Sequence, residues 1–489
     1  MSSSQVAGRA GTAAYAFRQF FVGGRWVTPT GDQTLDIRSP HDGFVVGSAP
    51  VATEADVDRA VAAARRAFDE GPWPRMTVPE RVGALRPLVE AYGRRASELA
   101  ALVTSEMGSP ATFSEMAHGL GPLTLMQQTL QFADAYAWSE ARGTGALIRE
   151  PAGVVGVITP WNVPQVTIVA KLIPALVAGC TVVVKPAPET PLDGMVLAEL
   201  LAEAELPPGV AAVLTGGATA GRRLVEHDSV DRIAFTGSAD VGRSIAATCG
   251  QRLARVSLEL GGKSAAIVCE DASLERTVAG LEFSSFLNNG QACVAQSRVL
   301  APRSRYDEIA NALAELAERF TVGDPRDAAT DIGPLVSARH REKVLSYLDV
   351  GVAEGATLVA GGTAPVEGLE AGHYVRPSVF RDVDNSMRIA REEIFGPVVV
   401  VIPYDDLDDA VHIANDSPYG LAGSVWTKDR HAGLALARRI RTGMFGINAF
   451  APGFELPFGG VKASGIGREY GPEAFDEYVE VKSVYGVPT

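Results

Sequence analysis

Residues 153–164, with the sequence GVVGVITPWNVP, decide the fold class. The first six residues are almost entirely apolar and predict a buried β-strand, and Pro160 and Pro164 then predict a turn. Trp161 and Asn162 stand between the two prolines, at the carboxyl end of the predicted strand. Open α/β sheets bind their ligands beyond the carboxyl ends of the strands. The segment therefore indicates an α/β protein with a tryptophan and an amide side chain near its ligand.

Two later segments extend the same pattern. Residues 181–186, TVVVKP, predict a second buried strand that ends at Lys185. Residues 232–242, RIAFTGSADVG, predict a strand, a tight glycine turn and the start of a helix. Glycines let the backbone approach a pyrophosphate, and a helix N-terminus stabilises its charge. The spacing of these glycines differs from the usual G-x-G-x-x-G and is weak evidence by itself. The position of the segment, one strand before Glu259, favours a phosphate site here.

A candidate nucleophile, Cys293, lies in residues 283–300, FSSFLNNGQACVAQSRVL, directly after a Gly-Gln break. A cysteine attacks as its thiolate, so its surroundings must lower its pKa or a nearby base must take its proton. The alternative is a buried structural thiol, which is a common role of free cysteine. A second motif, SLELGGK at residues 257–263, places Glu259 in an apolar strand. A carboxylate is costly to bury there unless it acts as a general base or in an ion pair, and this favours the nucleophile.

Length and composition exclude several classes of protein. A chain of 489 residues predicts two or three domains, and its 46% hydrophobic and 21% charged residues are typical of a soluble globular protein. The net charge of −14, without a basic tract, argues against nucleic acid and anionic membranes as partners. Four cysteines without C-x-x-C spacing argue against a disulfide framework or a structural metal site and favour the cytoplasm. No apolar run reaches the roughly 20 residues that span a bilayer.

Taken together, these motifs resemble the NAD(P)-dependent aldehyde dehydrogenase superfamily from about Phe20 to the C-terminus. The first 31 residues contain no acid and predict a short N-terminal extension. The resemblance implies an α/β fold with a Rossmann-type dinucleotide-binding domain, an α/β catalytic domain and a small β bridging element. The expected bounds are residues 1–133 and 152–259, residues 260–450, and residues 134–151 and 470–489. The bridging element, a projecting hairpin and an alternating C-terminal strand, implies a homodimer or homotetramer.

The resemblance also assigns catalytic roles. Cys293 attacks the aldehyde, Asn162 stabilises the oxyanion, and Glu259 activates the water that hydrolyses the thioester. Lys171 is implied in relaying protons toward Glu259. From the residues alone, Asn162 is as well explained as a turn-forming residue beside proline, and Lys171 as a lysine that extends from a helix surface into water.

The implied cofactor is NAD, with NADP possible. Pro188 stands where NAD-preferring relatives often carry an acidic residue, and the neighbouring Glu189 is the expected substitute, which favours NAD. The alternative for His340 is a residue on the exposed surface of a helix without a role in binding. The implied cofactor contacts are Ile158, Thr159, Trp161, Lys185, Glu189, Gly217, Gly237, Ser238, Val241, Leu260, Gly261, His340, Glu393 and Phe395.

The expected substrate is a small-molecule aldehyde that is oxidised to its carboxylic acid. An apolar funnel of moderate width predicts an aliphatic or aromatic aldehyde, and the lack of an aromatic cage argues against betaine aldehyde. Glu455, in the same loop as Phe450 and Phe454, would change this expectation if it reached the mouth. The expected funnel residues are Val163, Thr167, Val294, Phe450 and Phe454.

Three other functions remain open from the sequence. A CoA-acylating semialdehyde dehydrogenase would resolve the thioester with a thiol, and such relatives commonly lack the glutamate found here at Glu259. A cysteine hydrolase would need a histidine base, and no motif ties a histidine to Cys293. A non-catalytic protein on the same scaffold is the third.

Overall fold

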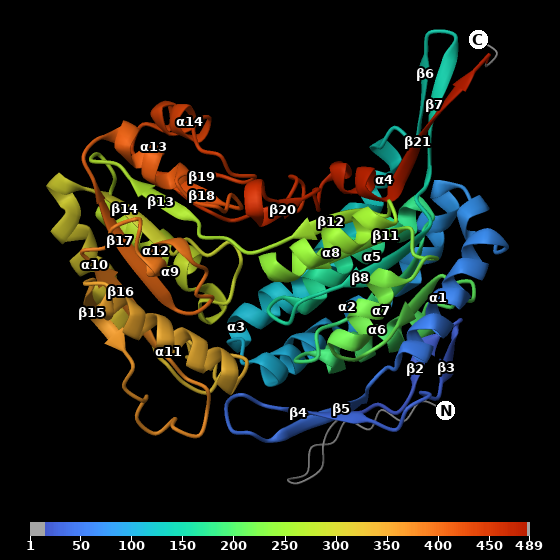
Figure 1. The fold of residues 1–489 in the computed structure, drawn as a ribbon, viewed down its shortest axis with the longest axis horizontal. Helices are drawn as coiled ribbons and strands as arrows, with labels where there is room; N and C mark the ends of the chain where they lie inside the picture. Colours follow the sequence, from blue (N-terminus) through green and yellow to red (C-terminus); the bar gives the residue numbers. More distant parts are fainter. Residues whose placement is uncertain (1–14, 487–489) are drawn as a thin grey trace.

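The computed structural model describes residues 15–486, which form two large sheets covered by helices and one small projecting sheet (Figure 1). The first 14 residues of the expected N-terminal extension lie outside the described residues, as do residues 487–489. Among the helices described, none has a stretch long and apolar enough to cross a bilayer.

The first large sheet is the expected Rossmann-type sheet. Its eight strands follow the order β20-β12-β11-β8-β9-β10-β2-β3, and the five central strands run parallel. The chain proceeds from β8 outward in one direction and then returns to β11 on the other side, so the topological switch point lies between β8 and β11. The strands are β2 (Phe20–Val22), β3 (Arg25–Val27), β8 (Val154–Ile158), β9 (Thr181–Lys185), β10 (Ala211–Val213), β11 (Arg232–Thr236), β12 (Arg255–Glu259) and β20 (Gly465–Ile466).

Helices cover both faces of this sheet, which is why its central strands are apolar on both sides. One face packs against α1 (Glu54–Asp69), α7 (Ala218–Glu226) and α8 (Ala239–Gln251), and the other against α2 (Val78–Met107), α5 (Pro164–Ala178) and α6 (Pro191–Glu203). The capping box of Thr53 and Asp56 starts α1. The helix α2 is 30 residues long and contains Pro87.

The second large sheet has seven strands in the order β15-β16-β17-β14-β13-β18-β19, all parallel to their neighbours except β15. Its helices also pack on both faces, α9 and α10 on one and α11, α13 and α14 on the other. The strands are β13 (Ala265–Val268), β14 (Arg298–Pro302), β15 (Thr357–Gly362), β16 (Arg376–Arg381), β17 (Val398–Tyr404), β18 (Gly423–Trp426) and β19 (Gly446–Ile447). The helices are α9 (Leu274–Phe286), α10 (Tyr306–Arg319), α11 (Ala338–Ala353), α12 (Arg388–Arg391), α13 (Leu407–Asn415) and α14 (Arg430–Ala437).

Two small sheets complete the fold. The strands β6 (Ser139–Arg142), β7 (Gly145–Pro151) and β21 (Val479–Tyr485) form an antiparallel sheet that projects from one corner of the molecule (Figure 1). The expected hairpin and the expected C-terminal strand are both present, and the two pair with each other. The other sheet consists of β1 (Tyr15–Ala16), β4 (Thr34–Arg38) and β5 (Val45–Pro50).

A helical layer beside the first sheet leads toward the site. After α2, the chain forms α3 (Ala111–Ser114), a six-residue π-helix (Glu115–Leu120) and α4 (Gly121–Ala135). The π-helix packs against α2 on one side. Such single-turn π-helices are frequent at functional sites.

Candidate active site

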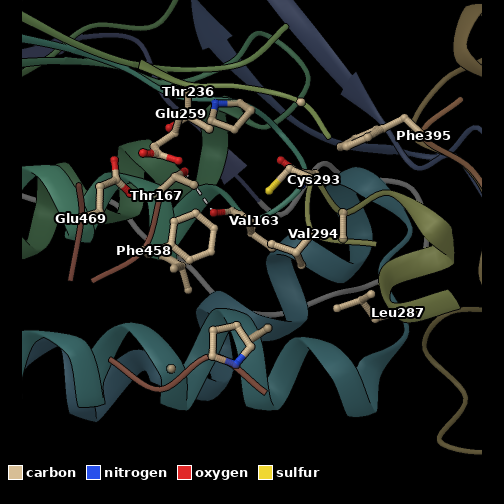
Figure 2. A pocket seen from close by; sticks show the side chains of 18 of the residues that line it. Val163, Thr167, Thr236, Glu259, Leu287, Cys293, Val294, Phe395, Phe458 and Glu469 are labelled. Atoms are coloured by element: carbon tan, nitrogen blue, oxygen red, sulfur yellow. Dashed lines mark hydrogen bonds between the residues drawn. The ribbon is translucent and has the colours of Figure 1, made fainter. Parts of the chain in front are cut away.

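A cavity of about 650 Å³ is lined by residues of both large α/β units and of the C-terminal segment. Cys293, Glu259 and Asn162 all line it, although they are far apart in the sequence. In the view of Figure 2, Glu259 and Glu469 lie to one side of Cys293 and Phe395 lies to the other. The cavity therefore joins the candidate nucleophile, the candidate base and the candidate oxyanion donor.

The Rossmann-type sheet explains why these residues meet. Trp161 and Asn162 follow β8, Gly237 and Ser238 follow β11, and Glu259 is the last residue of β12. All three strands are parallel neighbours, so their carboxyl ends lie along one edge of the sheet beside the switch point. The order of the strands, which cannot be read from the sequence, therefore brings these distant motifs together in one site.

A left-handed turn presents Cys293. Asn288, Asn289 and Gly290 have φ angles of 52°, 63° and 70°, a conformation that non-glycine residues rarely adopt. A Cβ at Gly290 would lie 2.2 Å from the backbone of Gly396, so only glycine fits there. The break that the sequence indicates before Cys293 is therefore real, and two asparagines extend it.

Side-chain hydrogen bonds hold this turn in place. The Asn289 amide donates to the backbone oxygens of Gly108 and Pro334, 2.9 Å each, and its oxygen accepts from the Gly333 N–H. The Gln291 side-chain oxygen accepts from the Val336 N–H. Buried polar groups with fixed partners restrict the positions that the following cysteine can take.

Asn162 is anchored to the same turn. Its Nδ2 donates to the Gln291 backbone oxygen over 2.9 Å, and its own backbone oxygen accepts from Asn288 Nδ2 over 2.9 Å. An amide nitrogen carries two hydrogens, so the second remains for an oxyanion formed near Cys293. The side chain is buried in the cavity wall rather than displayed on the surface of a turn.

The surroundings of Cys293 favour the thiol over the thiolate. Burial raises its pKa to about 12, and the negative charges of Glu393 and Glu259 add to this effect. The backbone N–H groups of Cys293 and Val294 act in the opposite direction. Burial therefore does not favour the first of the two routes to a thiolate that the sequence leaves open, a lowered pKa, and leaves transfer of the thiol proton to a base.

Glu259 has the properties of a base held out of water. It is 4% exposed, and neither carboxylate oxygen has a hydrogen-bond partner among the residues that the structure describes. Burial raises the pKa of Glu259 well above its ordinary value, with a further contribution from Glu469, while Lys171 and Arg468 lower it. A carboxylate with a raised pKa accepts a proton more readily near neutral pH.

Lys171 does not extend into water, so that reading is wrong. It is 1% exposed, and its Nζ donates to Glu469 Oε1, to Thr236 Oγ1 over 2.6 Å and to the Thr167 backbone oxygen over 3.3 Å. Lys171 does not line the cavity, but Glu469 does. The sequence analysis missed Glu469, for which the only signal is a carboxylate two residues after the glycine-rich run that ends at Gly467.

Some of the predicted cofactor residues also line the cavity, namely Trp161, Gly237, Ser238, Leu260, Gly261, His340, Glu393 and Phe395. The others lie outside it, on or directly after β8 and β9 and at the first turns of α7 and α8: Ile158, Thr159, Lys185, Glu189, Gly217 and Val241. Most residues of the two sets follow the same edge of the Rossmann-type sheet, and His340, Glu393 and Phe395 face that edge from the second α/β unit. An extended ligand laid along that edge would contact both.

His340 is not an isolated surface residue, so that alternative is wrong. Its ring centroid lies 5.5 Å from that of Trp161, and its Nε2 lies 2.6 Å from the Phe395 backbone oxygen. Because a carbonyl only accepts hydrogen bonds, Nε2 carries the hydrogen. Burial lowers the pKa of His340 to about 4, so the ring is neutral at neutral pH.

Several polar groups at this edge have hydrogen-bonding capacity that the residues described by the structure do not use. The buried Thr159 Oγ1 has no hydrogen-bond partner among the described residues. The Glu393 carboxylate accepts one hydrogen bond, from the Gly262 N–H to Oε1 over 2.9 Å. Lys185 Nζ donates to two backbone oxygens, which leaves its third hydrogen free, and Val241 exposes an apolar side chain. These residues fit a ligand with hydroxyl groups and an apolar ring.

The opposite end of the cavity is apolar. All five predicted funnel residues line it, whereas Glu455 does not. The sequence analysis missed a second apolar wall, because amphipathic helices without a motif carry no sign of which side faces a ligand. That wall and its neighbours comprise Phe113, Met116, Leu120, Gly121, Thr124, Leu287, Phe458 and Tyr470.

The comparisons with known proteins agree with this arrangement of two α/β units around a cysteine. The family model described as the aldehyde dehydrogenase family matches residues 26–484, and the chain belongs to this family. A geranial dehydrogenase of Castellaniella defragrans is 46% identical over 96% of this chain and 98% of its own length. A 3-succinoylsemialdehyde-pyridine dehydrogenase of a Pseudomonas species is 42% identical, with the same coverage.

Solved structures show the same fold. A Mycobacterium tuberculosis aldehyde dehydrogenase complexed with NAD+ has a TM-score of 0.95 and 47% identity, covering 98% of this chain and 99% of that one. A mutant of aldehyde dehydrogenase C from Pseudomonas syringae, complexed with NAD+ and octanal, has a TM-score of 0.92 and 38% identity, covering 96% and 97%. The expected fold class is thus confirmed.

Proposed function

We propose that this aldehyde dehydrogenase uses NAD to oxidise an apolar aldehyde to its carboxylic acid through a thioester on Cys293. The observation that carries the proposal is that Cys293, Glu259 and Asn162 line one cavity. That cavity has a polar end with Glu393 and an apolar end with Phe454.

In the first half-reaction, the Cys293 thiolate adds to the aldehyde carbonyl. The proton of the Cys293 thiol is transferred to a base before this attack. The oxygen becomes an oxyanion, which accepts hydrogen bonds from the free Asn162 amide hydrogen and the Cys293 backbone N–H. A bound nicotinamide would supply the hydride acceptor, so that the tetrahedral adduct on Cys293 could collapse to a thioester by losing its hydride.

In the second half-reaction, Glu259 takes a proton from water, and the resulting hydroxide attacks the thioester carbonyl. The Cys293 sulfur leaves as the thiolate, and the carboxylic acid is released. The ion pair of Lys171 and Glu469 lies behind Glu259, and its charges influence the pKa of that carboxyl. We propose that this pair stabilises the charge changes on Glu259 during turnover.

The residues at the polar end fit a dinucleotide. Glu393 would accept hydrogen bonds from the nicotinamide ribose, Lys185 and Glu189 would contact the adenosine ribose, and Gly237 and Ser238 would hold the pyrophosphate at the N-terminus of α8. A carboxylate near the adenosine ribose repels a 2′-phosphate, so Glu189 supports NAD over NADP. The NAD+ complexes of the structural neighbours support the same choice.

The apolar end supports an extended apolar substrate. Phe113, Met116, Leu120 and Phe454 supply carbon surface and no charge. Related proteins include a geranial dehydrogenase and one solved with octanal, whose aldehydes carry apolar tails. We infer an aliphatic or terpenoid aldehyde of about eight to ten carbons, since a tail of that length can reach the apolar wall and remain in contact with it.

Two other functions have less support. A CoA-acylating enzyme does not need a base beside the thioester, yet Glu259 is buried and aimed at the cavity. A cysteine hydrolase needs a histidine base, and His340, the histidine in the cavity wall, uses Nε2 to bind Phe395.

We extend the proposal to the assembly. The domain bounds are expected to follow the two large sheets, with residues 134–151 and 470–489 as the bridging element. In the projecting sheet, β6 and β21 are both edge strands, and Val481 and Tyr485 are exposed apolar residues that a second subunit would cover. A homodimer or homotetramer is therefore proposed. The four free cysteines support a cytoplasmic location.

A spectrophotometric assay tests the function. Protein is mixed with NAD and a panel of aldehydes without CoA, and reduced cofactor is followed at about 340 nm. Absorbance that grows with octanal or geranial supports the proposal, and repeating the panel with NADP settles the cofactor preference. Growth that requires CoA would favour the acylating alternative, and no growth with any aldehyde would favour the hydrolase or a non-catalytic protein.

A further inference from the structure

The segment Glu392–Gly396 holds the Glu393 carboxylate at the cavity and has little structure of its own. It lies between the four-residue helix α12 and strand β17. Phe395 adopts a left-handed φ of 64°, a conformation that a phenylalanine holds only when its neighbours impose it. The Glu393 carboxylate accepts a single hydrogen bond, from Gly262. Its direction therefore depends on how the backbone of the segment is held.

Three side chains of one helix contact this segment. His340 Nε2 donates to the Phe395 backbone oxygen over 2.6 Å, and Lys343 Nζ donates to the Glu393 backbone oxygen over 3.1 Å. Tyr347 donates its hydroxyl hydrogen to Glu392 Oε2 over 2.6 Å. All three residues belong to α11, at positions i, i+3 and i+7, which lie on one face of a helix.

We propose that His340, Lys343 and Tyr347 form a positioning ladder that fixes Glu393 for cofactor binding. The ladder ties down three successive parts of the segment: the Glu392 side chain and the carbonyls of Glu393 and Phe395. This inference rests on the proposed function, because it assumes that Glu393 binds the cofactor. The inference predicts that Tyr347, which does not line the cavity, affects the binding of a ligand that it does not touch.

Close packing makes the contact between helix and segment stiff. A Cβ on Gly396 would lie 2.8 Å from Val344 Cγ2, so the helix and the end of the segment are as near as glycine allows. Ile394 is buried in the apolar cluster that also contains Val344 and Leu348 of α11. The ladder and this cluster both hold the segment against α11, so the backbone that carries Glu393 has little freedom to move.

Tyr347, the ladder residue that does not line the cavity, offers the most direct test. Tyr347→Phe removes one hydroxyl and keeps the ring over which Lys343 and Arg388 lie. Because Arg388 also binds the Glu392 carboxylate, the double variant Tyr347→Phe/Arg388→Met frees that side chain fully. Ser346→Ala is the matched control: it removes a hydroxyl on the same helix that donates only to the Lys343 backbone oxygen.

Binding of NAD in the absence of aldehyde, measured by calorimetry, is the main readout. We expect Kd to rise about threefold in Tyr347→Phe and about tenfold in the double variant, as for the loss of one or more hydrogen bonds. KM for NAD should rise by the same factors, with kcat at saturating NAD within about twofold and Ser346→Ala unchanged. In a Glu393→Ala background, Tyr347→Phe should add nothing, since its effect passes through Glu393.

The possible failures can be told apart. If the wild-type protein binds NAD and oxidises aldehydes while both ladder variants bind NAD as tightly as it does, the ladder is overturned and the proposed function stands. If Tyr347→Phe weakens binding equally in the Glu393→Ala background, the effect does not pass through Glu393 and the ladder is again wrong. If the wild-type protein does not bind NAD, the proposed function fails and the ladder fails with it.

Discussion

The two ends of the cavity are built in different ways. At the polar end, Glu393, His340 and the backbone of Phe395 are joined by hydrogen bonds to fixed partners. At the apolar end, Met116 and Leu120 lie on a short π-helix, and about half of each side chain is exposed. Hydrogen bonds impose direction, whereas apolar contact imposes only shape and area. This difference indicates that the polar end binds its ligand in a single orientation, whereas the apolar end accepts a ligand by its size and hydrophobicity.

Cys293 lies between the polar and apolar ends of the cavity, and we expect its removal to have the largest effect on activity. Cys293→Ala leaves no nucleophile, so we expect oxidation to fall by at least about ten-thousandfold. Binding of NAD, measured by calorimetry, should change less than twofold, because the polar end is intact. Retained turnover would remove Cys293 from the mechanism, and lost NAD binding would show that the two ends are not separable.

Glu259→Gln should separate the two half-reactions. Because deacylation loses its base, we expect steady-state turnover to fall about a thousandfold, while one equivalent of reduced NAD still forms in a rapid burst. Stopped-flow absorbance records the burst. A missing burst would mean that Glu259 is already needed for the first half-reaction, in which the Cys293 proton must leave.

The raised pKa of Glu259 gives turnover a pH dependence. The carboxylate accepts a proton only when it is ionised, so kcat should fall as pH is lowered through the pKa of Glu259. Burial and Glu469 place that midpoint above the ordinary range for a glutamate. The measurement is a kcat profile across pH, with Glu469→Gln as the comparison. Removing that negative charge should move the midpoint to lower pH, and an unmoved midpoint would assign the titration to another group.

Asn162→Ala should slow acylation about a hundredfold or more, the usual effect of losing one oxyanion donor. The side chain also donates to Gln291 beside the cysteine, so Asn162→Asp is a useful second variant. It retains the size of the side chain but cannot donate from the substituted oxygen. If the burst rate is unchanged in both variants, Asn162 is not the oxyanion donor.

We expect the smallest effect on activity from a substitution at the apolar end of the cavity. Leu120→Ser replaces exposed carbon surface at the cavity wall, and we expect KM for octanal to rise about tenfold, the approximate value of one buried aliphatic side chain. KM for acetaldehyde, which is too short to reach this wall, should stay constant, as should KM for NAD. Equal changes for both aldehydes would mean that Leu120 does not contact the tail.

Much of this fold follows from local pattern. The strands β8, β9 and β11, the helix α5 and the hairpin of β6 and β7 have the residue patterns that predict them, because alternation, apolar runs and turn residues act over short distances. The bounds of α2 were harder to predict. Pro87 has no backbone N–H to donate, yet α2 is one continuous helix that packs against its neighbours.

Site residues with no local motif could not be predicted. Glu469 is identified only by its contact with Lys171, and Tyr347 only by its contact with Glu392. A charged or hydroxyl side chain on a helix or loop has the same sequence signature whether it faces water or a buried partner. Only the packing of segments that are distant in sequence distinguishes these cases.

The sequence by itself determined which chemical groups the protein has and where its strands end: a cysteine after a glycine break, a glutamate in an apolar strand, and an asparagine between prolines. Those features are set by covalent order and by side-chain polarity. The tertiary structure alone decided which groups share a cavity, that burial raises the pKa of the Cys293 thiol, and that Lys171 is paired with Glu469. The physical reason is that electrostatic energies depend on burial and on distance, and both arise only when strands and helices from across the chain pack together.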